Sequence, residues 1–375
     1  MDFNFPRESN ELKDRCRSFC ETELMEISKK YGETSNVPYE MIKEMAEKEI
    51  FKYLIPEEYG GKGVKAVNIC IIREELSKVY VHADVTFAMQ GLGSYPIVIL
   101  GTEIQKKKYL ERIGKGELLT TFALTEPDAG SDVSSIKTWA ERRGQQYIIN
   151  GIKRFISNGN CAHIAIVFAR TQNKDGISAF ILEKGINGFK VKRSIDLIAP
   201  HDIVEFQFED CEVSLDFILG SEGEGLEIAR KTLDLFRMSV GASAVGMAQA
   251  AFDASVEYSK NRVQFAKPIS KFQAISFKLA EMATDIEAAR LLVYRAAFLR
   301  DEGIKDFSKE ASMAKFFATE MAQRVIDQSL QIFGGLGVTK GNIAERLYRE
   351  VRAMRIYEGT TEIQKLIIAN KILKR

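Results

Sequence analysis

One carboxylate near the C-terminal end of the chain stands in a setting that suits acid–base chemistry. Glu358 lies between Tyr357 and Gly359, directly before a polar pair and an apolar segment with helical spacing. A glycine lets the backbone turn tightly, and Thr360 or Thr361 can cap the helix that follows. The carboxylate would then sit on a fixed elbow, where a general base is effective. An acidic residue that complements the dipole of a helix N-terminus is the alternative interpretation of this motif.

The histidines and cysteines offer no competing catalytic or metal site. His82, His163 and His201 are far apart in the sequence, so they form neither a metal-ligand pattern nor an evident nucleophile–base pair. Cys16 and Cys20 share a helix face, but no second ligand pair follows them, which favours buried thiols. The five cysteines are scattered, which fits a reducing compartment. We therefore expect a cytoplasmic protein without a bound metal.

The bulk composition argues against several classes of partner. The chain of 375 residues carries 53 Lys and Arg against 52 Asp and Glu, so its net charge does not favour nucleic acid or an anionic surface. No apolar run approaches the roughly 20 residues that cross a bilayer. The first residues lack the basic and apolar regions of a secretory signal. We expect neither nucleic acid nor membrane as a partner, and the length suggests two or three domains.

Helical periodicity marks the first third of the chain. Apolar residues recur at helical spacing, so we expect an N-terminal α-helical domain over residues 1–117. Its long apolar stretch over 85–100 predicts a buried helix pair, interrupted at Gly91, Gly93 and Pro96.

The period then changes to that of strands and changes back. Short β-branched and aromatic runs separated by Gly, Asn and Asp predict a β-barrel or sandwich domain over 118–225. Its strand over 147–151 should enter a tight turn. Long helices predict a C-terminal four-helix-bundle domain over 226–375; they cover 226–262, 272–301 and 308–333. The predicted class is α+β multidomain, with helical domains flanking a small β domain.

Further motifs occur in a fixed order along the whole chain. They are Ile55-Pro-Glu-Glu-Tyr-Gly-Gly61, Gly101-Thr102 with Gln105-Lys106, Leu124-Thr-Glu-Pro-Asp-Ala-Gly-Ser-Asp-Val133, Phe155-Ile-Ser-Asn158, Arg262-Val-Gln-Phe265 with Phe272-Gln273, Gln331-Ile-Phe-Gly-Gly-Leu-Gly337 and Tyr357-Glu-Gly-Thr360. Each motif is weak or moderate alone, but together, in this order and spacing, they are highly specific. Over essentially its whole length, the chain resembles the flavin-dependent acyl-CoA dehydrogenase family.

The resemblance implies FAD-dependent α,β-dehydrogenation of an acyl-CoA thioester. Such a reaction needs a base for the α proton and a flavin for the β hydride, while the protein supplies orientation and electrostatics. In the family, the Glu of Tyr-Glu-Gly-Thr is the base, which corresponds to Glu358 here. Some relatives carry the base on a long helix before an Arg, but Phe236 holds that position here, before Arg237. The family's oxyanion pocket combines the Glu backbone N–H with a flavin ribityl hydroxyl.

The resemblance also implies a set of binding residues and partners. The residues expected at the flavin and its nucleotide are Phe122, Leu124, Thr125, Phe155, Ser157, Arg262, Phe265, Gln273, Gln331, Gly334, Gly335, Thr360 and Glu362. Those expected at the substrate are Ser131, Asp234, Arg237, Tyr357, Gly359 and Tyr95. A family member would pass its electrons to an electron-transferring flavoprotein and would form a homotetramer.

The chain departs from the family pattern in three places. Ala266 stands where Gly is usual, and Phe155 replaces the commoner Trp beside the flavin. The larger departure lies within 198–203, where relatives carry Arg-x-Ser-x-Thr and this chain has Ala199, His201 and Ile203. An unusual substrate, a changed handling of the flavin and local structural drift each account for it.

Polar residues over 90–95 are the other hint about the substrate. They suggest an acyl group other than a plain long chain, or else a packed helix interface. An acyl or aminoacyl thioester carried on a carrier protein in a biosynthetic pathway is therefore the alternative to a CoA thioester. A flavoprotein without dehydrogenase activity is a third possibility. The sequence sets neither the length and branching of the acyl group nor the direction of the reaction.

Overall fold

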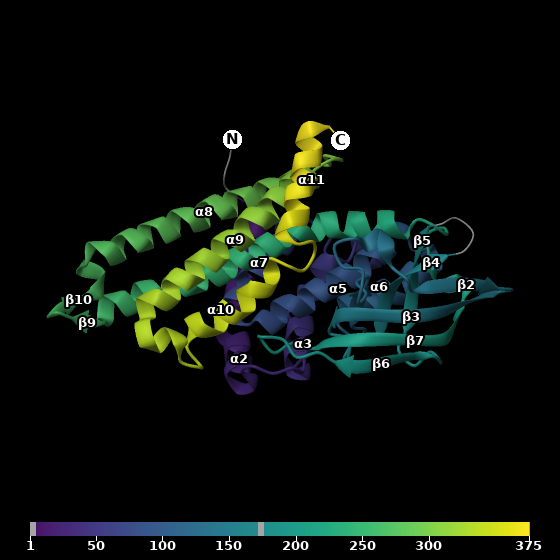
Figure 1. Cartoon of the computed structure of the whole chain (residues 1–375), viewed down its shortest axis with the longest axis horizontal. Coiled ribbons are helices and arrows are strands. Elements are labelled where there is room, and N and C mark those ends of the chain that lie inside the picture. The colour runs from purple at the N-terminus through teal and green to yellow at the C-terminus, as the bar shows by residue number, and fades with distance from the viewer. Residues whose placement is uncertain (1–4, 172–175, 375) are drawn as a thin grey trace. The chain divides into compact units, whose positions relative to one another are not determined.

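The computed structural model describes residues 5–171 and 176–374 (Figure 1). The first four residues, part of the segment that lacks a secretory signal pattern, lie outside this described part. The chain forms two compact units, each assembled from separate segments. Unit 1 combines Met1–Ser28, Ala66–Asp84 and Asp234–Arg375, and unit 2 combines Lys29–Lys65 and Val85–Leu233. The domain boundaries predicted near residues 117 and 225 stay predictions.

Unit 1 is built mainly of helices. Its elements are α1 (Arg7–Phe19), α4 (Ala66–Val79), most of α7 (Gly225–Asn261), α8 (Gln273–Asp301), α9 (Ser308–Phe333), α10 (Ile343–Met354) and α11 (Thr361–Leu373), and α2 (Met25–Tyr31) crosses the unit boundary. The bounds of α7, α8 and α9 fall within one residue of the predicted long helices, so this prediction is confirmed. α8 and α9 run side by side (Figure 1).

Small residues let the helices of unit 1 approach one another closely. A Cβ added to Gly246 of α7 would lie 2.2 Å from the backbone oxygen of Glu74 on α4, so only glycine fits there. Ser255 of α7 and Ser329 of α9 are buried and share a hydrogen bond of 2.7 Å. The buried face of α9 is rich in alanine, which brings α7 and α8 close to its axis.

Unit 2 contains an eight-stranded sheet in the order β6-β7-β3-β2-β4-β5-β8, and β1 pairs with β4 (Figure 1). The strands are β1 (Thr120–Ala123), β2 (Trp139–Arg143), β3 (Gln146–Ser157), β4 (Ile164–Thr171), β5 (Ile177–Glu183), β6 (Phe189–Ser194), β7 (Ile203–Ser214) and β8 (Ile218–Leu219). In the sequence, helices precede and follow this β region, which confirms the predicted helical–β–helical order. Helices α3 (Tyr39–Glu47) and α6 (Glu103–Gly114) also belong to this unit.

The predicted turn after residue 151 is wrong. β3 continues through Gly151, whose φ of 148° falls at a register shift between β3 and β7. A Cβ there would lie 2.4 Å from the Thr138 hydroxyl, so the glycine serves a close approach within the sheet rather than a turn. The tight turn instead precedes the strand, at Gly144.

The buried helix pair predicted over 85–100 is also wrong, because α5 runs unbroken over Val81–Leu100 with Pro96 inside it. Gly93 does not interrupt the helix. It allows β1 to pack against α5, since a Cβ at Gly93 would lie 2.3 Å from the Thr120 hydroxyl oxygen. Periodicity could not reveal this, because a glycine that permits close packing and a glycine that ends a helix look alike in sequence.

The polar residues of α5 hold backbone rather than line an open cavity. Gln90 is 1% exposed, donates to the carbonyl of Leu118 at 3.0 Å and accepts from the N–H of Thr120 at 2.7 Å. The hydroxyl of Ser94 donates to the carbonyl of Gly91. Of the two interpretations of the polar residues over 90–95, an unusual acyl group or a packed helix interface, these contacts favour the packed interface.

Among the described residues, no helix combines the length and the apolar character that crossing a membrane requires.

Ala266 sits in a backbone conformation that explains why a glycine is usual there. A hairpin joins β9 (Val263–Gln264) to β10 (Lys267–Pro268), and its two turn residues, Phe265 and Ala266, have φ of 51° and 60°. Left-handed backbone costs a non-glycine residue about 1–2 kcal/mol. We expect Ala266→Gly to raise the free energy of unfolding by about 1 kcal/mol, measured by thermal denaturation.

A control for this replacement lies in the next helix. Ala280 is exposed in the interior of α8, where glycine should cost about 1 kcal/mol. Ala280→Gly should therefore change stability in the opposite direction. Destabilisation by Ala266→Gly would show that the turn is not strained.

Candidate active site

The backbone around Glu358 forms a tight corner between α10 and α11. Glu358 and Gly359 both have left-handed backbone, with φ of 53° and 90°. Thr360 then caps α11, because its hydroxyl accepts from the N–H of Ile363 at 3.3 Å. The corner therefore turns the Glu358 side chain away from the path of the helix that follows.

Side chains from two helices hold this corner from behind. Gln364 of α11 is buried and its amide donates to the carbonyls of Glu358 at 3.1 Å and Gly359 at 3.0 Å. Lys315 of α9 donates to the carbonyls of Tyr357 at 2.7 Å and Gly359 at 2.5 Å. Three consecutive carbonyls are thus fixed, which leaves the Glu358 side chain little freedom of position.

The Glu358 carboxylate has the electrostatics of a base. Its Oε2 is buried and has no hydrogen-bond partner among the described residues. Burial raises the pKa of Glu358 above its ordinary value, and the positive charges of Arg73, Lys315 and Arg237 oppose that rise. A carboxylate with a raised pKa and an unsatisfied oxygen suits proton abstraction.

Two buried ion pairs flank Glu358. Arg73 of α4 is 1% exposed and binds both oxygens of Asp84, with N–O distances of 2.7 and 3.0 Å. Arg237 of α7 pairs with Asp234, whose other oxygen accepts from the Ser308 hydroxyl at 2.6 Å. The structure thus brings the predicted substrate residues Asp234 and Arg237 together with Glu358, Tyr357 and Gly359 in unit 1.

A second group of predicted residues lies at the other end of α9. The rings of Tyr258 and Phe333 stack with centroids 4.5 Å apart, which joins the C-terminal ends of α7 and α9. The exposed residues of this end are Arg262, Phe265, Gln273, Gln331, Gly334 and Gly335. Arg262 forms no ion pair within the described chain, and added Cβ atoms at Gly334 and Gly335 would meet nothing within 4 Å. A free guanidinium beside open backbone fits a phosphate-bearing nucleotide.

The third group belongs to unit 2. Phe155 lies at a bulge where β3 loses register with β7, has φ of 59° and is 55% exposed. A bulge of this kind re-aims a side chain out of the sheet. Of the other predicted residues, Phe122 lies on β1, Leu124 and Thr125 follow that strand directly, and Ser157 ends β3. Ser131 is exposed, and Tyr95 is half-buried on α5.

A buried ion pair that the sequence analysis missed supports this third group. Lys153 is 0% exposed and donates to Glu126 at 2.7 Å and to the carbonyl of Leu124 at 3.0 Å. The Arg154 N–H donates to the carbonyl of Thr125 at 2.8 Å. The two strand segments of the predicted flavin edge are therefore fixed to each other.

Comparison with known proteins decides the family. The N-terminal, middle and C-terminal domain models of acyl-CoA dehydrogenase match residues 6–117, 121–211 and 223–373. The acryloyl-CoA reductase (NADH) of Anaerotignum propionicum is 41% identical over 100% of this chain and 97% of its own length. The chain belongs to the acyl-CoA dehydrogenase family. The structural resemblance is equally complete: butyryl-CoA dehydrogenase from Megasphaera elsdenii shares 39% identity over both whole chains, with a TM-score of 0.95.

Two further solved structures bear on the cofactor and the partner of acyl-CoA dehydrogenases. A chain in the structure of the electron transferring flavoprotein of Acidaminococcus fermentans is 42% identical, with full coverage of both chains and a TM-score of 0.95. An acyl-CoA dehydrogenase from Bacillus anthracis was solved in complex with FAD; it is 32% identical over 99% of this chain and 68% of its own, with a TM-score of 0.91.

The segment that departs from the acyl-CoA dehydrogenase pattern is anchored by a residue that the sequence analysis did not single out. Asp202 is buried, and its carboxylate accepts from the Asn160 amide at 2.7 Å and from the Asn160 N–H at 3.1 Å. Its backbone oxygen accepts from the Asn158 N–H at 2.7 Å. Segment 198–203 is therefore tied to the turn that follows Ser157. A lone aspartate in a loop gives no such signal in sequence.

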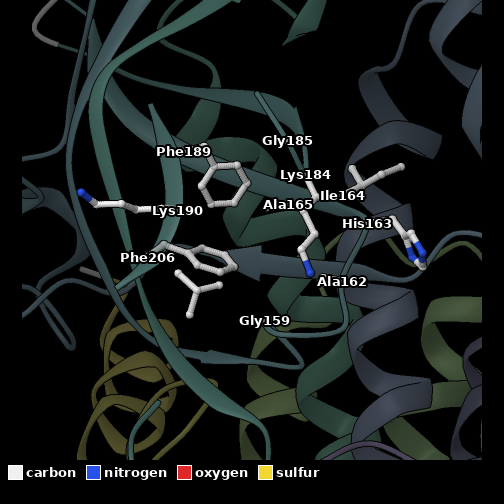
Figure 2. Close-up of a pocket in the computed structure, with 11 residues that line it drawn as sticks. Gly159, Ala162, His163, Ile164, Ala165, Lys184, Gly185, Phe189, Lys190 and Phe206 are labelled. Carbon is white, nitrogen blue, oxygen red and sulfur yellow. The ribbon is translucent and has the colours of Figure 1, made fainter. Parts of the chain in front are cut away.

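Unit 2 also contains a pocket of about 370 Å³ (Figure 2). The rings of Phe189 and Phe206 line it, with His163, Lys184 and Lys190 around them. Both lysines are engaged elsewhere, Lys184 with the carbonyl of Asn160 and Lys190 with Glu209. None of the residues predicted to bind FAD or substrate lines this pocket.

Proposed function

We propose that this chain is an FAD-dependent acyl-CoA dehydrogenase in which Glu358 removes the α proton of the thioester. The observation that carries the proposal is the buried Oε2 of Glu358, which lacks a partner on a rigidly held corner. The Glu358 N–H also has no acceptor among the described residues. It can therefore donate to the thioester carbonyl, where negative charge develops as the proton leaves.

The residues present fit FAD as the cofactor. Bound FAD would accept the hydride from the β carbon of the substrate. The flavin edge would be held by Phe122, Leu124, Thr125, Phe155 and Ser157, the nucleotide by Arg262, Phe265, Gln273, Gln331, Gly334, Gly335, Thr360 and Glu362, and the substrate by Ser131, Tyr95, Asp234, Arg237, Tyr357 and Gly359. The exposed Phe155 bulge and the open backbone at Gly334 support these assignments.

The cofactor assignment has a direct test. Heat denaturation of the purified protein should release one FAD per chain, identified by chromatography and mass. Release of FMN, or of no flavin, would contradict the assignment and would favour a scaffold without dehydrogenase activity.

The substrate is proposed to be a short acyl-CoA. Two of the similar proteins are named for the short acyl groups acryloyl and butyryl. The packed contacts of Gln90 support a CoA thioester over a carrier-bound one, because this polar side chain holds backbone instead of lining an open cavity. Competition between butyryl-CoA and a butyryl carrier protein should favour CoA; preference for the carrier protein would support the alternative.

The proposed electron acceptor is an electron-transferring flavoprotein, and the proposed location is the cytoplasm. The proposed acceptor is supported by the similar chain found in the structure of the electron transferring flavoprotein of Acidaminococcus fermentans. The five cysteines are all free thiols, which supports a reducing compartment.

We also propose that the chain forms a homo-oligomer, as a tetramer. Lys315 and Phe333 of α9 lie about 27 Å apart at 1.5 Å per residue, so the Glu358 corner and the Arg262 group sit far apart within one subunit. One subunit would then contribute to two cofactor sites. The exposed face of α8 supports an interface, because Phe277, Leu291 and Phe298 are 57%, 48% and 56% exposed.

Replacing Phe277 and Phe298 together by serine should dissociate the oligomer, because both lie on one face of α8 and would bury apolar surface. Analytical ultracentrifugation should show a smaller species for this variant. Ile104→Ser, which removes an 80% exposed side chain from α6, should leave the mass unchanged. A wild-type monomer would contradict the proposed assembly.

A further inference from the structure

We propose that Lys315 is the positioning residue of the base: its ammonium group fixes the peptide groups on both sides of Glu358 and supplies the positive charge that keeps the Glu358 carboxylate ionised. This inference rests on the proposed role of Glu358. It adds a residue that lies on another helix, 43 positions earlier in the sequence, outside the motifs that identify the family.

The hydrogen bonds of Lys315 point to this role. Lys315 is 0% exposed, and its Nζ donates to the carbonyls of Tyr357 and Gly359, the two residues that flank Glu358. Glu358 itself has left-handed backbone, which costs a non-glycine residue about 1–2 kcal/mol and needs support from its surroundings. One ammonium group bridging both neighbours provides that support.

The balance of charge around Glu358 leaves Lys315 as its counterion. Arg73 is matched by Asp84, which also accepts from Ser243 at 2.7 Å. Arg237 is matched by Asp234. The Lys315 ammonium instead donates to two backbone oxygens, so among these three cations it is the one without a carboxylate partner other than Glu358.

Other charged groups near the corner do not change this balance. Glu320 of α9 pairs with Arg355 at 2.8 Å. Glu362 is exposed on α11. The charges that act on Glu358 include those of Arg73, Lys315, Arg237 and Asp84. Those that act on Lys315 include Glu358, Arg237, Glu320 and Glu362. The neighbouring Tyr357 faces Arg73, Asp84, Glu358 and Glu350. Burial lowers the pKa of Lys315, and the Glu358 carboxylate opposes part of that fall, as expected for a pair that shares one buried site.

The sign of the effect on catalysis follows from this arrangement. A nearby positive charge favours the ionised carboxylate, so its removal raises the pKa of Glu358. More of the base is then protonated at neutral pH and unable to accept a proton. The acid limb of the pH–rate profile should therefore move to higher pH.

Two replacements of Lys315 separate its charge from its hydrogen bonds. Lys315→Gln keeps N–H donors but removes the charge, and Lys315→Arg keeps the charge. We expect Lys315→Gln to shift the acid limb of flavin reduction upward by about one pH unit or more. At pH 7 the rate constant at saturating thioester should fall about tenfold or more, because a larger fraction of Glu358 is then protonated. KM and bound flavin should stay within about threefold of wild type, and Lys315→Arg should restore the position of the acid limb.

A matched control and a second readout keep the test decisive. Lys278 of α8 is half-buried and donates to Gln328 of α9, so Lys278→Met removes another lysine from the same helix pair without touching the corner. Its pH profile should match wild type. If Lys315→Gln folds poorly, Lys315→Arg still tests the geometry. About a tenfold or greater fall in its rate constant, with an unshifted acid limb, would support the role of the two hydrogen bonds from Lys315 to the carbonyls of Tyr357 and Gly359.

Two outcomes would overturn the inference. One is a Lys315→Gln enzyme whose rate and acid limb both match wild type. The other is a loss of activity explained entirely by loss of flavin, which a merely structural lysine would give. Failure of the proposed function is distinct, because Glu358→Gln would then remain active in an otherwise wild-type chain.

Discussion

Replacing Glu358 by glutamine should lower the rate of flavin reduction by an acyl-CoA thioester about 10²- to 10⁴-fold. Glutamine has the size of glutamate but cannot accept the α proton. The corner itself should persist, because the bonds from Gln364 and Lys315 go to backbone oxygens. Anaerobic stopped-flow measurement of the flavin absorbance gives the rate, and equilibrium titration gives the affinity for the thioester, which should change little.

A control with the same chemical change comes from the neighbouring helix. Glu345 of α10 pairs with Arg349 at 2.7 Å, away from the corner, so Glu345→Gln should keep near-normal turnover. Near-normal turnover by Glu358→Gln would instead show that Glu358 is not the base.

The burial of Glu358 makes stability depend on pH. The pKa of Glu358 is raised in the folded state, so between the unfolded and folded values the folded state binds more protons. Stability contributed by this group therefore falls as the pH rises through that window. Glu358→Gln removes this titration, so the free energy of unfolding should fall less steeply with pH through the window than in wild type, as measured by urea denaturation at several pH values.

Replacing Arg73 by methionine should cost about 3–5 kcal/mol of unfolding free energy, because it leaves the carboxylate of Asp84 buried and unpaired. Asp84 is 0% exposed, so water cannot replace the guanidinium. Urea denaturation followed by circular dichroism measures the loss. Loss of the Arg73 charge should also raise the pKa of Glu358 further.

Two comparisons make the Arg73 prediction specific. Arg7→Met breaks an ion pair whose side chains are 93% and 58% exposed, and it should cost well under 1 kcal/mol. The double variant Arg73→Met with Asp84→Leu removes both charges and should recover much of the stability. A cost below 1 kcal/mol for Arg73→Met alone would show that Asp84 finds another partner or takes up a proton.

Sequence periodicity predicted the long helices of unit 1 because each keeps an apolar stripe facing its neighbours over many turns. It failed at α5 and at Gly151, where glycines permit close packing within a helix and a strand. Such contacts depend on the partner surface, which no local pattern contains. The Glu358 corner was predictable because glycine and a capping threonine are local signals.

The charges around Glu358 were harder to predict, because the sequence alone does not distinguish a buried arginine from an exposed one. Their positions nevertheless carry a signal. Lys315 stands four residues after Ala311 and three before Ala318, on the buried alanine face of α9. Arg73 similarly follows Ile69 by four residues on α4. A charged residue at a core position of an amphipathic helix is rarely buried without a partner, and it therefore points to a site.

The anaerobic visible spectrum of the purified protein, recorded before and after addition of a panel of acyl-CoA thioesters, tests the central claim most directly. We predict a flavin spectrum that is bleached by a short saturated acyl-CoA, because the proposed base, Glu358, would remove the α proton and the β hydride would reduce the flavin. A flavin spectrum that stays unchanged with every thioester in the panel would contradict the assignment of this chain as an acyl-CoA dehydrogenase.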